Sequence, residues 1–126
     1  MRVRLLVGSL IATVVLGGGA MAVNNARAAK TVKEVMKLAH KDLVPSKQTL
    51  LKTILAGSAK DEEKKQLLDL YIDMFEGEPK KGDAGEWKMQ AGAAVLSAAK
   101  VVLGREGAIE ELDKASNCKS CHDKFK

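Results

Sequence analysis

Two cysteines and a histidine near the carboxyl end have the types and the spacing that attach a haem group. They lie in the sequence Cys118-Lys119-Ser120-Cys121-His122, and the chain has no other cysteine. Positions i, i+3 and i+4 of a helix share one face. One helical turn could therefore present both thiols to the two haem vinyl groups, with the imidazole beside them on the same side as the iron. The motif predicts one covalent haem c, with thioether links at Cys118 and Cys121 and with His122 as the proximal iron ligand.

Three other chemistries use the same residue types. A thioredoxin-like redox pair needs its C-x-x-C motif in a βαβ unit, but no run of this chain alternates apolar and polar residues for long enough to form a strand. A Cys118–Cys121 disulfide would leave His122 without a role. A zinc site would need ligands at a spacing that His40, the other histidine, does not provide. Haem attachment uses all three residues of the motif.

The amino-terminal segment has the parts of an export signal. Arg2 and Arg4 give a positive start, residues 5–16 are an apolar run, and small-x-small sites that end at Ala22 and Ala28 follow. The run is shorter than the roughly 20 apolar residues of a membrane-spanning helix. We predict a signal peptide over residues 1–28, with cleavage after Ala22 as the alternative, and a mature domain over residues 29–126. The protein would be periplasmic or otherwise exported, without stable membrane insertion.

Composition and charge limit the class of protein. Only 3% of the 126 residues are aromatic, which disfavours a sheet-rich fold. The formal charge of +5 falls to +2 without Arg2, Arg4 and Arg27, since 18 basic residues then stand against 16 acidic ones. This charge is too small to indicate a nucleic-acid partner. The sequence shows no catalytic serine arrangement and no glycine-rich phosphate loop, so we do not expect an enzyme.

The first helical stretch of the predicted mature domain is interrupted. It begins at Thr31, where Glu34 completes a capping box, and it carries apolar residues on one face. Pro45 restricts the residue before it and removes a backbone donor, so the helix stops or bends there. The pattern resumes at Ser46 and ends at Gly57. We expect one helix that is broken near Pro45.

Three further stretches have helical periodicity. The second begins near Asp61, the third opens at Asp83, and the fourth runs from Ala108 almost to the carboxyl terminus. The residues expected in the core of the second and third stretches are Leu67, Leu68, Tyr71, Met74, Phe75, Trp87, Ala91, Ala94, Ala98 and Val101. Four stretches with short connections predict an all-α fold, an antiparallel four-helix bundle with covalently bound haem.

The position of the motif at the end of a helical chain resembles the class II c-type cytochromes, the cytochrome c prime family. The resemblance covers roughly residues 31–126 and is strongest at residues 82–87 and 117–123. It implies a left-handed four-helix bundle with the haem between the helices and with His122 as the proximal ligand. It also implies that the first helix covers the distal side of the haem.

The resemblance links the distal residue to function. Family members with an apolar residue there hold five-coordinate haem and bind small gases, whereas members with methionine hold six-coordinate haem and transfer electrons. The first helix of this chain offers Met36 and His40, one turn apart. A thioether avoids burying an imidazole whose second nitrogen needs a partner, so we expect Met36 as the distal ligand. His40 is the alternative, and a site that uses neither stays open.

These expectations predict an exported one-electron-transfer protein, with a five-coordinate haem protein that binds NO or CO as the alternative. Lysines on the last helix could form a basic surface that steers an acidic redox partner protein, or they could simply be solvated. These lysines are Lys114, Lys119, Lys124 and Lys126. The sequence leaves a homodimer open.

Overall fold

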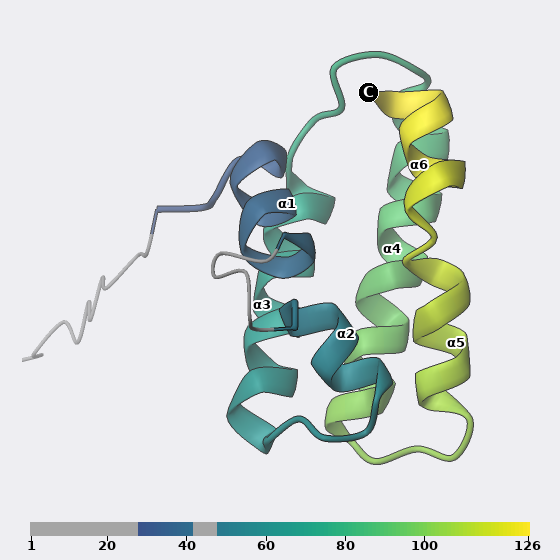
Figure 1. The fold of residues 1–126 in the computed structure, drawn as a ribbon. Coiled ribbons are helices and arrows are strands. Elements are labelled where there is room, and N and C mark those ends of the chain that lie inside the picture. Colours follow the sequence, from purple (N-terminus) through teal and green to yellow (C-terminus); the bar gives the residue numbers. More distant parts are fainter. Residues whose placement is uncertain (1–27, 42–47) are drawn as a thin grey trace, which may run out of the picture.

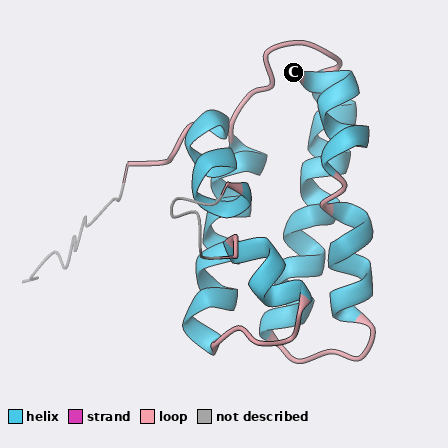
Figure 2. Ribbon diagram, in the orientation of Figure 1, coloured by secondary structure: helices cyan, strands magenta, loops and turns pink. Residues whose placement is uncertain are grey.

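The computed structural model describes residues 28–41 and 48–126, and all the regular structure in these two ranges is helical (Figures 1 and 2). The helices are α1 (Val32–His40), α2 (Leu50–Leu55), α3 (Asp61–Glu76), α4 (Ala84–Val102), α5 (Ala108–Ala115) and α6 (Cys118–Phe125). The predicted all-α class is confirmed for these ranges. No helix in this part of the chain is both long and apolar enough to cross a membrane. The predicted signal peptide lies outside the described residues, apart from Ala28.

The first predicted stretch forms two helices. The capping box is present, because the Glu34 amide donates to Thr31 Oγ1 at 3.3 Å and the Thr31 amide donates to Glu34 Oε2 at 2.8 Å. Helix α1 ends at His40, and α2 begins at Leu50, where the Thr49 hydroxyl accepts from the Lys52 amide. The break predicted near Pro45 and the restart predicted at Ser46 fall in residues 42–47, outside the described residues.

Helices α3 and α4 form the centre of the core. The predicted α4 stripe is confirmed, since Trp87, Ala91, Ala94, Ala98 and Val101 are all buried, and Ser97, which was not predicted, is buried as well. On α3 the prediction was partly wrong: Leu70 is buried, whereas Leu68 and Phe75 are only partly buried. The buried side of α3 is rotated because α3 packs against α1 and α2 as well as α4.

The predicted continuous fourth helix is a pair of helices, which corrects the prediction. Helix α5 ends at Ala115, and α6 begins at Cys118. The Ser116 hydroxyl donates to the Leu112 carbonyl at 2.6 Å and competes with the helical ladder. The Asn117 side chain accepts from the amides of Lys119 and Ser120 and so starts a new helix. The apolar stripe concealed this break because its periodicity continues across it.

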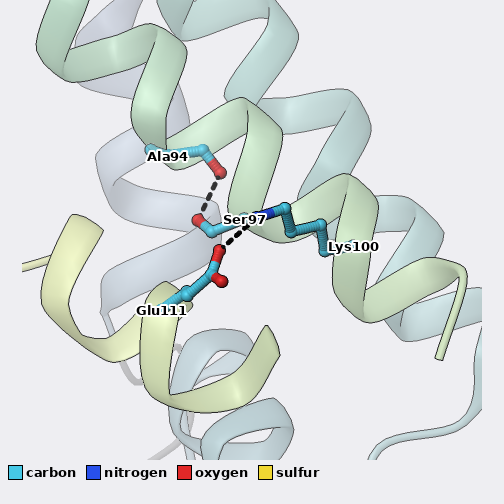
Figure 3. Close-up of polar contacts among 4 residues, drawn as sticks. All are labelled: Ala94, Ser97, Lys100 and Glu111. Carbon is cyan, nitrogen blue, oxygen red and sulfur yellow. Dashed lines mark hydrogen bonds and ion pairs between the residues drawn. The ribbon is translucent and has the colours of Figure 1, made fainter. Parts of the chain in front are cut away.

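The arrangement of the helices is visible in Figure 1. Helix α3 lies beside α4, α4 lies beside α5, and α1 and α2 both lie against α3. Figure 3 shows how α4 meets α5: Lys100 Nζ lies 2.7 Å from Glu111 Oε2, and the buried Ser97 hydroxyl donates to the Ala94 carbonyl. Helices α1 and α6 lie at the same end of the molecule, near the carboxyl terminus. The predicted site residues are on these two helices.

Candidate functional site

A cavity of about 450 Å³ brings most of the predicted site residues together. Met36 and His40 line it from α1, and Cys121 and His122 line it from α6. Cys118 is the first residue of α6, one turn before Cys121. The volume is within the roughly 300–1,000 Å³ that ligand and cofactor pockets occupy. Residues more than 80 positions apart in the chain therefore share one cavity.

The walls of this cavity are largely apolar. Helices α3 and α4 contribute Met74, Trp87, Ala91 and Ala94, and α6 contributes Phe125. All five of these residues are at most 5% exposed. The side of the cavity formed by these residues is therefore apolar, as in most cofactor pockets.

Helix α6, which carries the motif, is fixed at both ends. At its start, Asn117 caps the helix and Gln90 Nε2 of α4 donates to Ser120 Oγ at 3.1 Å. At its end, the Phe125 ring meets Trp87 edge to face, with ring centroids 5.3 Å apart. The Trp87 indole N–H in turn donates to the Gly77 carbonyl at 3.0 Å. These contacts keep the motif helical and hold Cys121 and His122 against the cavity.

His40 has a partner at each ring nitrogen. Its Nε2 shares a hydrogen bond of 2.8 Å with the Tyr71 hydroxyl, and its Nδ1 lies 3.3 Å from Met36 Sδ. Burial, together with the nearby charge of His122, lowers the pKa of His40 from 6.5 to about 4. His40 is therefore neutral at neutral pH, and His122 lines the same cavity from α6.

Sequence reasoning missed the role of Tyr71. We placed it in the core, and it is 0% exposed, but its hydroxyl also faces the cavity residues of α1. A buried tyrosine usually needs a hydrogen-bond partner. That requirement could have directed attention to the two histidines, although periodicity alone could not choose between them.

The lysines around the cavity are mostly not those that the sequence suggested. Among Lys114, Lys119, Lys124 and Lys126, only Lys126 lines the cavity. Four other lysines line it as well, namely Lys33, Lys37, Lys41 and Lys80. Lys33, Lys37 and Lys41 recur every four residues, a spacing that would have placed them on one side of α1. We call these five cavity-lining lysines the basic rim.

The structure bears on only part of the alternative chemistries. Among the described side chains, which do not include that of Cys118, no group of three or more His, Cys, Asp or Glu could hold a metal ion. The motif helix lies beside helices and not in a βαβ unit. Compared with known proteins, the chain matches no family model, no curated protein and no solved structure.

Proposed function

We propose that this protein is an exported c-type cytochrome that carries one covalent haem and transfers single electrons. The observation that carries the proposal is the shared cavity, where Cys121 and His122 of α6 meet Met36 and His40 of α1. The protein would be an antiparallel four-helix bundle in which α1 with α2, and α5 with α6, each stand for one helix of the class II cytochromes. The resemblance rests on the motif and on helix order.

The residues present fit a haem group. Cys118 and Cys121 would hold it by thioether links, and His122 would be the proximal ligand from the same helix. When bound, the haem supplies an iron that accepts and releases one electron. The apolar walls, which include Trp87 and Phe125, would keep water away from the cofactor. The surroundings of the iron would then rearrange little when its charge changes.

The contacts of His40 favour Met36 as the distal ligand. The Nε2 atom of His40 is already engaged with the Tyr71 hydroxyl, and its Nδ1 atom faces Met36 Sδ. For His40 to bind iron, one of these contacts would have to break. A thioether sulfur has two lone pairs, so Met36 could bind iron while it keeps its contact with His40. His40 remains the alternative distal ligand.

Covalent haem is tested on the mature protein expressed with a c-type maturation system. Denaturing gel electrophoresis with haem-peroxidase staining should show haem at the mass of the chain. The matched control is the variant with Cys118→Ser and Cys121→Ser, which should give a protein band without stain. A wild-type band without stain would overturn the proposed function.

Electron transfer and gas binding are separated by carbon monoxide. A six-coordinate ferrous protein should bind the gas slowly and incompletely, because Met36 must leave first. The Met36→Leu variant, which is similar in volume, should bind it rapidly and completely. Rapid, complete binding by the wild type would instead support the five-coordinate gas-binding alternative.

The basic rim indicates the kind of redox partner. Its five lysines line the cavity through which electrons would pass, and among the described residues Glu78 is the one acidic side chain that lines it. An excess of positive charge at this place favours an acidic partner protein by electrostatic steering. We propose that such a partner docks over the basic rim.

A further inference from the structure

We propose that His40 is a positioning residue that holds the Met36 sulfur toward the haem iron, and that Tyr71 fixes the tautomer of His40. This inference rests on the proposed function with Met36 as the distal ligand. The structure carries it through two contacts in series, 2.8 Å from Tyr71 Oη to His40 Nε2 and 3.3 Å from His40 Nδ1 to Met36 Sδ. We call these three residues the Tyr71–His40–Met36 chain.

The direction of each hydrogen bond follows from what the three groups can donate. A thioether sulfur has no hydrogen and can only accept. An unprotonated Nδ1 facing it would bring two lone pairs together, so the favourable arrangement has the proton on Nδ1. A neutral imidazole carries one N–H, which leaves Nε2 as an acceptor. The Tyr71 hydroxyl therefore donates to His40, and His40 donates to Met36.

Burial and ring packing hold the Tyr71–His40–Met36 chain in this arrangement. Tyr71 is 0% exposed on α3, and its ring also meets the His40 ring edge to face, with centroids 5.8 Å apart. Met36 and His40 are four residues apart on α1, so their side chains lie on one side of that helix. The core thus holds one end of the chain, and the sulfur to be oriented is at the other end.

Methionine needs such a device more than other ligands do. Its side chain has three rotatable bonds and adapts to irregular space. A hydrogen bond at one sulfur lone pair restricts this motion and leaves the other lone pair for iron. Donation from His40 also withdraws electron density from the sulfur, which favours the ferrous over the ferric state. His40 would therefore raise the reduction potential without touching the iron.

The test is a redox titration of the haem-loaded protein, combined with the near-infrared charge-transfer band that marks His/Met ligation. His40→Leu removes the donor, and His40→Asn returns an amide N–H close to the place of Nδ1. We expect both variants to keep the band. At a fixed potential, the ratio of ferrous to ferric protein should be about tenfold lower in His40→Leu than in the wild type. This corresponds to a reduction potential about 60 mV lower for a one-electron couple. His40→Asn should recover part of this loss.

Three further variants separate the Tyr71–His40–Met36 chain from general packing. Tyr71→Phe should lower the potential by less than His40→Leu, and the double variant should lie no lower than His40→Leu alone, because Tyr71 acts through His40. Leu67→Met, a volume-conserving change at a buried residue of α3 that does not line the cavity, should leave the potential unchanged. Tyr71→Phe also serves if a His40 variant does not fold.

Distinct results would overturn the proposal. A wild-type protein that lacks the His/Met band, with six-coordination lost in His40→Leu and kept in Met36→Leu, would make His40 the ligand. Unchanged potentials in His40→Leu and Tyr71→Phe, with haem bound and the band present, would remove the positioning role and leave the proposed function intact. A wild-type protein without covalent haem would overturn both proposals, and staining detects this separately.

Discussion

The hydroxyl of Tyr71 lies 2.8 Å from Nε2 of His40, although 31 residues separate the two in the chain. This contact joins α3 to the end of α1 beside the cavity. It gives a polar partner to a tyrosine that is otherwise completely buried, and it occupies one nitrogen of a histidine that the sequence offered as an iron ligand. The stability of the fold and the proposed choice of distal ligand therefore involve the same hydrogen bond.

Tyr71→Phe should lower the free energy of unfolding by about 1–2 kcal/mol, because it removes a hydrogen bond and leaves a buried acceptor on His40. Urea unfolding followed by circular dichroism measures this change. A double-mutant cycle with His40→Leu should give a coupling of about 1 kcal/mol. Additive effects of the two substitutions would contradict a direct interaction.

The free energy of unfolding should fall as the pH is lowered from about 6.5 to about 4. His40 has a pKa of about 4 in the fold against 6.5 without it, so in this interval the unfolded chain binds a proton that the folded chain does not. The loss is at most about 3.5 kcal/mol, since one pKa unit corresponds to about 1.4 kcal/mol. Urea midpoints across this pH range measure it.

The control for the pH dependence is His40→Asn, which should flatten the curve between pH 4.5 and 6.5. The Thr31 amide and hydroxyl lower the pKa of Glu34 below 4.5. The Glu34 carboxyl also contributes stability that is lost on acidification, but only below that pH. Parallel curves for the wild type and the variant above pH 4.5 would show that His40 does not titrate as stated.

Asn117→Ala should destabilise the fold by about 1 kcal/mol, because α6 loses the side chain that accepts from the amides of Lys119 and Ser120. Asn117→Asp keeps an acceptor at the same place and should stay close to the wild type. Thermal unfolding distinguishes the two variants. Equal losses would mean that the cap contributes nothing to this helix.

Gly82→Ala should be more destabilising than Gly104→Ala. Both glycines have positive φ, +94° and +68°, which costs an alanine about 1–2 kcal/mol. A Cβ at Gly82 would also lie 2.7 Å from Phe125 Cδ1 and 2.9 Å from the Lys124 carbonyl oxygen, whereas a Cβ at Gly104 would meet nothing within 4 Å. Urea unfolding measures the free energy of unfolding of both variants. The difference between them gives the cost of the clash at Gly82 beyond the backbone strain that both share. Similar losses would show that the loop moves freely away from α6.

Replacing lysines of the basic rim with glutamate should slow electron transfer to an anionic oxidant. With hexacyanoferrate(III) as the probe, the haem-loaded Lys33→Glu, Lys37→Glu double variant should react about tenfold more slowly at low salt, and the difference should shrink as salt is added. The exposed Lys52 and Lys65 lie on α2 and α3 and do not line the cavity. The Lys52→Glu, Lys65→Glu double variant has the same net charge and should change the rate much less, and an equal effect would indicate net charge as the cause.

The sequence by itself determined those features that depend on neighbouring residues. The capping box at Thr31, the start of α4 after Asp83 and the buried stripe from Trp87 to Val101 are set within a few residues of chain. The haem motif is equally local, because its chemistry needs only five residues on one helix. Periodicity was less informative across Ser116 and Asn117, where an unbroken apolar stripe concealed two helices.

Only the tertiary structure decided which side chains meet in the cavity. The contact of His40 with Tyr71 depends on how α1 is rotated and shifted against α3, and the place of Lys80 depends on the loop between α3 and α4. Side chains from several helices fix that rotation together through their packing, so no single stretch of sequence contains it. The sequence favoured Met36 over His40 only because a buried imidazole needs a partner for its second nitrogen. The neighbouring helix supplies such a partner, the Tyr71 hydroxyl, and this contact supports the proposal that His40 positions Met36.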